Sequence, residues 1–211
     1  MDRLAQIDTF SRFTQVSRET ITSLKKYEES IIEANSRFNL VGKSTLNYIW
    51  TRHFLDSSQL IDFIDKNDKT LADIGSGAGF PGLVLAILAK DRKINLKIRL
   101  IEKSKKKTTF LKQVIGDLDL DVDVVTHNIL IDKYKLSQDL ITARAFKPLR
   151  VILQFLNARA ENWKKIFLFL GKTGKNDLDQ ASKRWNIGYK QRMSITSSDS
   201  IIIEINKLKK K

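Results

Sequence analysis

The sequence predicts an α/β fold: a parallel sheet with helices on both faces and an antiparallel hairpin at one edge, preceded by a helical N-terminal segment. Two observations predict the sheet. After residue 66, short runs rich in Ile, Leu and Val alternate with amphipathic stretches of helical length, as in repeated strand–helix–strand units. The last two runs follow each other without a helix between them, which indicates a hairpin.

Residues 1–65 are predicted to form a helical extension packed on the core of the α/β domain, which spans residues 66–211. Apolar residues recur at helical spacing in 17–38 and again in 45–64. The turn-like sequence NLVGKS at 39–44 joins these two helices.

Within residues 66–211 the apolar runs predict strands at 70–74, 96–101, 122–126, 139–143 and 165–170, with a final hairpin at 187–195 and 201–205. Helices are expected between them, at 81–91, 103–117, 148–162 and 175–185. The lysine-rich end, residues 207–211, is expected to fray.

The composition excludes several classes of protein. With no cysteine in 211 residues, disulfides and cysteine-ligated zinc are excluded, and we expect no metal. No apolar run approaches the roughly 18 residues of a membrane span. Asp2 and Asp8 lie where a signal peptide would be basic and then apolar. We therefore expect a cytoplasmic protein, and a monomer.

The net charge of +14 is unevenly distributed. Residues 1–65 carry 8 basic and 9 acidic side chains, whereas residues 66–211 carry 30 and 15. A positive field of this size attracts polyanions, with nucleic acid the first candidate and an anionic membrane surface the second. Composition does not choose between them.

The segment LADIGSGAGFPGLVLAI places four glycines between a strand and a helix: Gly75, Gly77, Gly79 and Gly82. Glycines let the backbone turn sharply and approach a ligand closely. Pro81 suits the first helical turn, where its missing N–H costs no hydrogen bond. In an open parallel sheet this loop lies at the carboxyl edge, where such folds bind ligands.

Two overlapping motifs in this loop leave two cofactors open. Gly77, Gly79 and Gly82 form G-x-G-x-x-G, which suggests a dinucleotide. The longer string D-x-G-x-G-x-G, from Asp73 to Gly79, is usual in methyltransferases that bind S-adenosylmethionine. Glu102, at the end of the second strand, is placed to accept hydrogen bonds from the ribose of either cofactor.

Four blocks in a fixed order carry a more specific signal: FNLVGKSTLNYIWTRHFLDSSQL, DIGSGAGFPG, IEKSKKKTTFLKQV and ITARAFKPL. Over nearly the whole chain, the sequence resembles the bacterial small-subunit ribosomal RNA guanine-N7 methyltransferases, the RsmG or GidB family. The resemblance implies a Rossmann-like methyltransferase domain at 66–211 that uses S-adenosyl-L-methionine. It also implies a substrate, guanine 527 of 16S rRNA, free or in the small ribosomal subunit, and no membrane partner.

The resemblance also implies cofactor contacts. These are the loop residues Asp73, Gly75, Gly77, Gly79 and Phe80, the acid Glu102, the segment Asn128, Ile129 and Leu130 after the third strand, and Arg144 after the fourth. Three features depart from the family. An acid is common in place of Leu130 and Ser in place of Ala143, and the family's Lys-Gly pair is reversed here as Gly171-Lys172. The adenine contact at Ile129 and Leu130 is then expected to use backbone groups.

The residues present also limit the chemistry. Methylation at pyrimidine C5 commonly needs a cysteine nucleophile, which this chain lacks. Methylation of an exocyclic amine often uses a proline-rich loop, and here Pro81 and Pro148 stand apart. Guanine N7 offers a lone pair and no proton, so no general base is required and orientation dominates. Arg144 is the candidate for orienting base or cofactor.

Seven side chains are candidates for RNA contact: Lys103, Lys105, Lys106, Lys107, Lys147, Arg150 and His53. The first four lysines follow Glu102, whereas Lys147 and Arg150 follow the fourth strand, so both groups are expected near the carboxyl edge where the cofactor binds. A structural role remains open for His53 and Asp56. Two other functions also remain open: a nicotinamide oxidoreductase, and a non-catalytic RNA-binding protein with a vestigial pocket.

Overall fold

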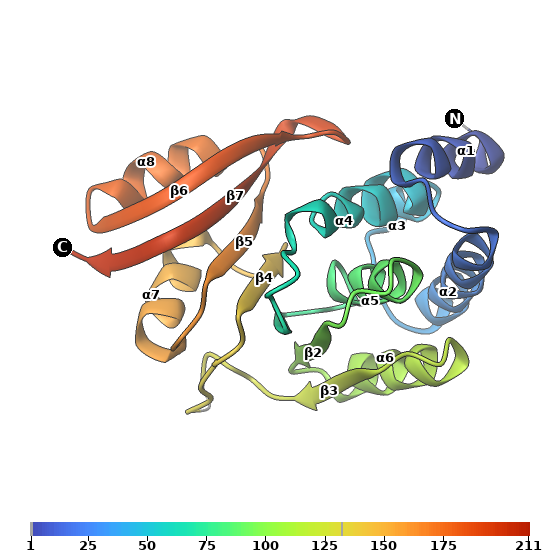
Figure 1. The fold of residues 1–211 in the computed structure, drawn as a ribbon, viewed down its shortest axis with the longest axis horizontal. Helices are drawn as coiled ribbons and strands as arrows, with labels where there is room; N and C mark the ends of the chain where they lie inside the picture. Colours follow the sequence, from blue (N-terminus) through green and yellow to red (C-terminus); the bar gives the residue numbers. More distant parts are fainter. Residues whose placement is uncertain (1, 132) are drawn as a thin grey trace.

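The computed structural model describes residues 2–131 and 133–211, and within them seven strands form one sheet in the order β3-β2-β1-β4-β5-β7-β6 (Figure 1). The strands are β1 (Thr70–Ile74), β2 (Lys97–Glu102), β3 (Val122–Thr126), β4 (Leu140–Arg144), β5 (Lys165–Leu170), β6 (Trp185–Ser194) and β7 (Ser197–Lys210). The first five pair in parallel, and β7 pairs antiparallel with both β5 and β6. This arrangement confirms the predicted fold class.

The strand order reverses between β1 and β4. From β1 the chain steps outward to β2 and β3, and then returns to place β4 on the other side of β1. Leu71 of β1 therefore pairs with Ile98 on one side and with Leu140 on the other. The loops that follow β1 and β4 leave the sheet in different directions, which opens a crevice at the carboxyl edge of these strands.

Helices cover both faces of the sheet: α5 (Gly82–Asp91) and α6 (Lys105–Asp117) on one, α7 (Leu149–Arg159) and α8 (Gly174–Ser182) on the other. Successive strand residues point to opposite faces, so Leu71 joins the first core and Ala72 the second. Residues 82–89 of α5 are all buried. They are apolar on every side because α5 lies between the sheet and the N-terminal helices.

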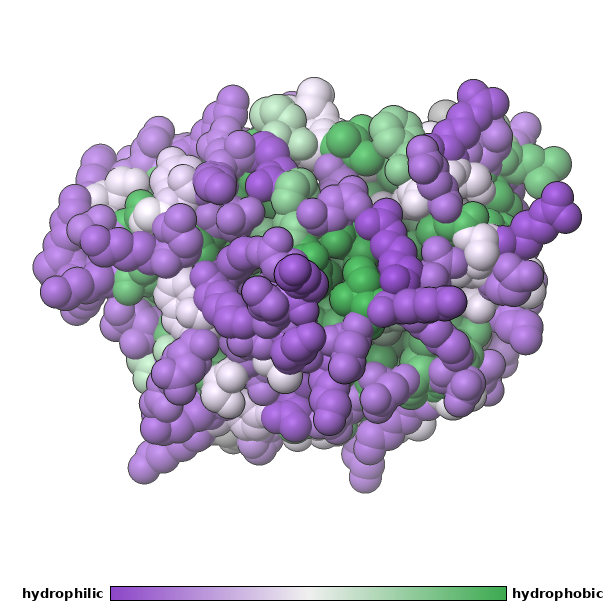
Figure 2. All heavy atoms as spheres, viewed as in Figure 1, coloured by the Kyte–Doolittle hydropathy of each residue, from purple (hydrophilic) through white to green (hydrophobic). Residues whose placement is uncertain are grey.

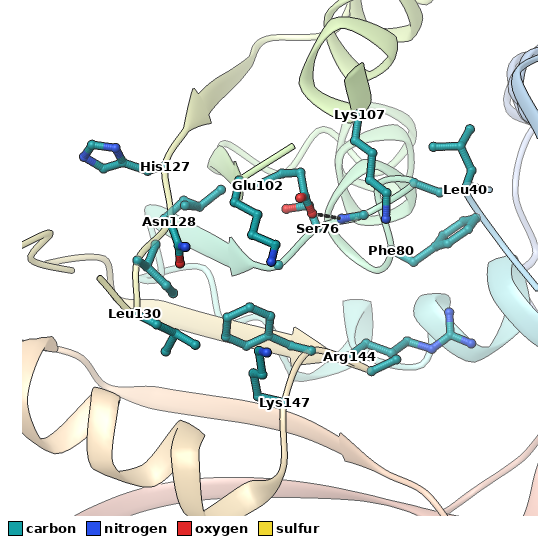
Figure 3. A pocket seen from close by; sticks show the side chains of 18 of the residues that line it. Leu40, Ser76, Phe80, Glu102, Lys107, His127, Asn128, Leu130, Arg144 and Lys147 are labelled. Atoms are coloured by element: carbon teal, nitrogen blue, oxygen red, sulfur yellow. Dashed lines mark hydrogen bonds between the residues drawn. The ribbon is translucent and has the colours of Figure 1, made fainter. Parts of the chain in front are cut away.

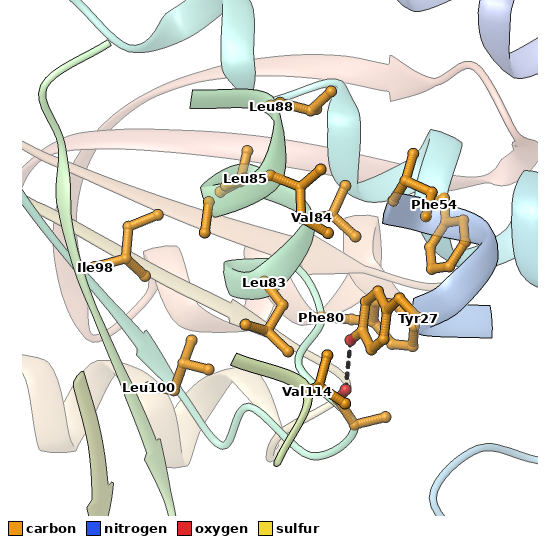
Figure 4. Close-up of a cluster of buried hydrophobic side chains, with 14 of the residues drawn as sticks. Tyr27, Phe54, Phe80, Leu83, Val84, Leu85, Leu88, Ile98, Leu100 and Val114 are labelled. Carbon is orange, nitrogen blue, oxygen red and sulfur yellow. Dashed lines mark hydrogen bonds between the residues drawn. The ribbon is translucent and has the colours of Figure 1, made fainter. Parts of the chain in front are cut away.

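The N-terminal helices share that first core. They are α1 (Arg3–Thr14), α2 (Arg18–Arg37) and the short α3 (Lys43–Leu46). Figure 1 shows them beside α5 and α6, away from α7 and α8. In Figure 4, Tyr27 of α2 lies against Phe80 of the glycine loop, and its hydroxyl donates a hydrogen bond to the carbonyl of Ala78. Burial raises the pKa of Tyr27, which keeps this donor protonated.

The prediction of a single helix over 45–64 is wrong. After α3 the chain forms a π-helical segment (Ile49–Leu55), continues into α4 (Asp56–Ser58) and ends in a 3-10 turn (Ile61–Phe63). Side chains from several sides of this segment have fixed partners: Trp50 packs edge-on against Phe10, while His53 stacks on Phe80. These tertiary contacts override the regular 3.6-residue spacing, and π-helical turns often occur at functional sites.

The chain end also differs from expectation. Residues 207–210, expected to fray, extend β7: Ile187 pairs with Leu208 and Trp185 with Lys210. Leu208 is half-buried against the core under α8, which holds the strand in place. In the described part of the chain, no helix is both long and apolar enough to cross a bilayer.

Candidate active site

The glycine loop lies at the strand-order reversal and is shaped by three left-handed backbone conformations. Gly75, Gly77 and Gly79 have φ angles of 73°, 58° and 106°, which residues with side chains rarely adopt. The loop is anchored to the next strand, because the amides of Gly75 and Ser76 donate to the carbonyl of Ile101 at 2.8 and 3.2 Å. A Cβ at Gly75 would come within 2.1 Å of the Phe146 ring.

Asp73 and Gly79, expected as cofactor contacts, lie behind the loop and not among the residues of the cavity wall. Asp73 is fully buried, and one of its carboxylate oxygens accepts a hydrogen bond from the amide of Gly82 at 3.1 Å. Burial raises the pKa of Asp73 to about 7. At Gly79, a Cβ would clash with Tyr27 and Leu83. Both residues therefore shape the loop from inside.

The loop forms one wall of a cavity of about 600 Å³. This volume is within the range of about 300–1,000 Å³ that is usual for small-molecule sites. Figure 3 shows Glu102 at its centre, where the carboxylate accepts hydrogen bonds from the amides of Gly77 (3.0 Å) and Ser104 (2.9 Å). A carboxylate has about four acceptor positions, so Glu102 keeps capacity for a ligand hydroxyl.

The opposite wall follows β3 and contains Asn128, Ile129 and Leu130. Ile129 is buried, whereas Leu130 is partly exposed and shows its side chain to the cavity in Figure 3. The cavity therefore joins an acid at the end of β2 to an apolar surface after β3. Eight of the ten expected cofactor residues line it: Gly75, Gly77, Phe80, Glu102, Asn128, Ile129, Leu130 and Arg144.

Some wall residues were missed by the sequence reasoning. Leu40, Val41 and Gly42 come from the segment predicted only as a turn between helices. The side-chain oxygen of Asn35 accepts hydrogen bonds from the amides of Leu40 (2.9 Å) and Val41 (3.0 Å), which fixes this segment against α2. Phe146 and His127 also line the cavity. In the sequence, the adjacent apolar residues Leu40 and Val41 within NLVGKS indicate that this turn is buried.

Arg144 is held by partners from the N-terminal segment. Its Nε lies 3.0 Å from a carboxylate oxygen of Asp56, and another nitrogen donates to the carbonyl of Arg52. The guanidinium also lies 5.8 Å from the ring centre of Phe80 and 5.9 Å from that of Phe169. Burial lowers the pKa of Arg144 and the charge of Asp56 opposes this, so the group remains charged.

His53 lies beside Arg144 and is neutral. Burial and the nearby positive charges of Arg144 and Arg52 lower its pKa to about 3. Its Nδ1 lies 3.3 Å from Arg144 and can only accept there, which leaves the proton on Nε2 for Thr45 Oγ1 at 3.0 Å. The ring stacks on Phe80 with centres 4.7 Å apart. The structure thus brings His53 to the cavity as a packed, polar wall group.

The expected basic residues divide into two sets. Lys103, Lys107 and Lys147 line the cavity, and Figure 3 shows Lys107 and Lys147 on opposite sides of it. Lys105 and Lys106 are exposed on the first turn of α6, and Arg150 is exposed on α7; these three lie outside the wall. On the face drawn in Figure 2, hydrophilic side chains cover most of the surface and surround a central hollow where apolar residues show.

Comparison with solved structures supports the fold. The 16S rRNA methylase RmtB superposes with a TM-score of 0.56 at 15% identity, covering 91% of this chain and 76% of that one. TrmK of M. capricolum, solved with S-adenosyl-homocysteine, gives a TM-score of 0.54 at 19% identity over 72% of this chain and 67% of that one. At these identities the likeness extends to the fold alone.

Sequence comparison is more specific. The chain is 38% identical over 198 residues to a ribosomal RNA small subunit methyltransferase G of Pelagibacter ubique, covering 93% of this chain and 92% of the relative. It is 34% identical to the protein of that name from Rickettsia rickettsii, over 93% and 98% of the two chains. The family model described as GidB, rRNA small subunit methyltransferase G, matches residues 20–204. The chain therefore belongs to the GidB family of rRNA small subunit methyltransferases.

Proposed function

We propose that this protein transfers a methyl group from S-adenosylmethionine to N7 of a guanine in small-subunit ribosomal RNA, guanine 527 of 16S rRNA. The observation that carries the proposal is the cavity at the strand-order reversal. One wall is glycine backbone, Glu102 supplies a carboxylate at the centre, and Ile129 and Leu130 form an apolar part of the opposite wall. These are the surfaces that an adenosine with an amino-acid tail requires: close backbone, a ribose acceptor and an apolar face.

The residues fit the cofactor on structural grounds. Gly77 faces the cavity, and a Cβ there would have no protein atom nearer than 3.8 Å, so its missing side chain leaves space for a ligand. Glu102 is oriented by two backbone amides, and its free acceptor positions suit two neighbouring ribose hydroxyls. When bound, S-adenosylmethionine supplies a methyl group on a sulfonium, whose C–S bond electrons return to sulfur as the methyl leaves.

Guanine N7 is an acceptor that matches the residues around the cavity. The lone pair of N7 forms the new N–C bond without loss of a proton, so no side chain has to act as a base. His53 is packed against Phe80 with both ring nitrogens directed at protein partners, consistent with a positioning role. Arg144 is fixed by Asp56 and the carbonyl of Arg52 in the cavity wall, where it can help to orient the base or the cofactor.

The dinucleotide alternative is less well supported. In the G-x-G-x-x-G string, Gly79 packs against Tyr27 and Leu83, while a Cβ at Gly82 would meet Leu100 and Asp73. Only the first glycine of the three is in the wall of the described cavity. In a dinucleotide site the second glycine lets the backbone approach the pyrophosphate, but here that glycine, Gly79, packs inside the loop; close packing at Gly82 is expected of either motif.

Ribosomal RNA suits the charges at the mouth of the cavity. Lys103, Lys107 and Lys147 line the cavity where its wall reaches solvent, which we call the mouth, and they can contact phosphates without reading sequence. The N7 atom of a paired guanine lies in the deep major groove of A-form RNA, where side chains hardly reach. We therefore propose that the target guanine is unpaired or flipped out when it is methylated.

The test is transfer of labelled methyl from S-adenosylmethionine to unmodified 16S rRNA and to small subunits assembled from it, with the modified nucleoside mapped by mass spectrometry. Label in 7-methylguanosine at position 527 is the expected result. Label on another atom or position overturns the proposed specificity. Absence of label from both substrates, with S-adenosylhomocysteine still bound, supports the non-catalytic alternative.

A further inference from the structure

A second cavity, of about 210 Å³, lies on the other side of the β4 carboxyl end. It shares His53, Arg144 and Ala145 with the first cavity, so the two spaces meet at these residues. Its remaining walls come from the N-terminal segment, including Arg52 and Asp56, from the end of β5, including Phe169 and Gly171, and from residues of β6, β7 and the turn between them. Ligands in the two cavities would therefore come close to each other beside Arg144 and Ala145.

The walls of this second cavity are fixed by a buried carboxylate. One oxygen of Asp56 accepts hydrogen bonds from the hydroxyls of Ser194 and Thr196, both at 2.8 Å. The other oxygen pairs with Arg144. Asp56 thus ties the β6–β7 turn to β4, and holds the hydroxyl wall and the guanidinium in one arrangement. A preorganised polar site of this kind is typical of binding sites that must orient a ligand.

The size and chemistry of the second cavity suit one heterocyclic base. Its volume falls below the range of about 300–1,000 Å³ that holds larger ligands. The aromatic residue Phe169 is part of its wall, and Arg52 lies in the same wall with an exposed side chain and no carboxylate partner among the described residues. An aromatic face stacks on a flipped base, and an arginine donates to guanine O6.

We propose that this second cavity is the subsite for the acceptor guanine, with Arg52 as the donor to O6; the inference rests on the proposed function. N7 then meets the sulfonium methyl where the two cavities adjoin, beside Arg144 and Ala145, because in-line transfer needs the two atoms in contact. The N7 lone pair forms the N–CH₃ bond as the C–S bond breaks, the electron pair of that bond stays on sulfur, and the positive charge passes to the purine. No proton moves in this step.

The sharpest test fills the second cavity and leaves the first unchanged. Gly171 is suitable because a Cβ there meets no atom within 4 Å and Gly171 is absent from the first cavity's wall. Gly171→Leu should lower kcat/KM for the RNA by about 100-fold and leave S-adenosylhomocysteine affinity within twofold of wild type. Gly116→Leu is the matched control, since Gly116 is equally open but lies on α6 outside both cavities.

A second variant keeps the test informative if Gly171→Leu does not fold. Ser200→Leu fills the same cavity from β7. It should also lower kcat/KM for the RNA and leave the affinity for S-adenosylhomocysteine unchanged. If either variant methylates the RNA at the wild-type rate, the proposed subsite is wrong. It is also wrong if the affinity for S-adenosylhomocysteine falls as much as kcat/KM for the RNA. Failure of the wild-type protein to methylate guanine is a different result, because it rejects the proposed function itself.

The role of Arg52 is tested on its own. Arg52→Gln should reduce kcat/KM for the RNA at least tenfold, and inosine at the target position, which keeps O6, should be methylated by the wild-type protein. Replacing the target guanine by 2-aminopurine, which keeps N7 and lacks O6, should lower the wild-type rate and abolish the difference between the wild-type protein and the Arg52→Gln variant. A difference that persists with 2-aminopurine overturns the assignment of Arg52 to O6.

Discussion

The carboxylate of Asp56 lies 3.0 Å from Nε of Arg144, and the two side chains are only 11% and 16% exposed. One residue belongs to the N-terminal helical segment and the other ends β4. The pair therefore holds the N-terminal segment against the strand whose end borders both cavities. Such a pair fixes geometry more than it adds stability, because burial of both charges offsets much of their attraction.

Breaking this pair should destabilise the protein. Asp56→Asn leaves the Arg144 charge buried without its counter-ion and should lower the free energy of unfolding by about 3 kcal/mol. Denaturant unfolding followed by circular dichroism measures the change. Asp62→Asn is the matched control: its partner Arg92 and Asp62 itself are 33% and 66% exposed, so the loss should stay below about 1 kcal/mol. Equal losses in the two variants would contradict a special role for the buried pair.

A charge in the glycine loop should remove cofactor binding without unfolding the protein. Gly77→Asp places a carboxylate in the cavity beside Glu102, where like charges repel and the ligand loses space. Aspartate tolerates the left-handed backbone better than most residues. Calorimetric titration should show affinity for S-adenosylhomocysteine at least about 100-fold weaker, or about 2.8 kcal/mol. Gly116→Asp, on the exposed face of α6, should bind normally; wild-type affinity in Gly77→Asp would place the cofactor elsewhere.

The neutral state of His53 should make stability fall in mild acid. The folded protein lowers the pKa of His53 from 6.5 to about 3, so between these values the unfolded chain binds a proton that the folded chain does not. Stability from this group is complete above about pH 6.5 and falls as the pH decreases, by about 2 kcal/mol at pH 5.

The check compares wild type with His53→Gln, which keeps a polar group but does not titrate. Urea unfolding at several pH values should give a curve for wild type that drops more steeply between about pH 7 and pH 4 than that of the variant. Parallel curves would mean that folding does not lower the pKa of His53.

The lysines at the cavity mouth should control the salt dependence of RNA binding. A triple change of Lys103, Lys107 and Lys147 to Gln removes three candidate phosphate contacts. The slope of log K against log salt should become shallower by about 2, at about 0.7 for each contact to single-stranded RNA. S-adenosylhomocysteine affinity should change little.

Three lysines at the far end of β7 provide the control. Lys207, Lys209 and Lys210 carry the same charge and are exposed. Because β7 runs antiparallel to β5, they lie near the amino end of β5, away from the carboxyl ends of the strands where the cavities lie. Their change to Gln should leave the salt slope close to that of wild type. If the two triple variants shift the slope equally, RNA binding follows net charge and the mouth has no particular role.

The sequence by itself determined the strand–helix order, the glycine loop and the acid at the end of β2. These follow from local rules: apolar runs mark strands, and glycine is needed where Gly75 and Gly77 take left-handed conformations. The ends of consecutive parallel strands also lie at one sheet edge, so the meeting of Gly77 with Glu102 was predictable from order alone.

Only the tertiary structure decided what surrounds this loop. Asp73 and Gly79 belong to the same motif as Gly77, yet they face the interior, because loop conformation and packing against Tyr27 set their directions. The π-helical turn, the Asp56–Arg144 pair and the second cavity depend on residues that lie far apart in the chain. Local spacing carries no information about such contacts, since they depend on how α4, β4 and the β6–β7 turn pack together.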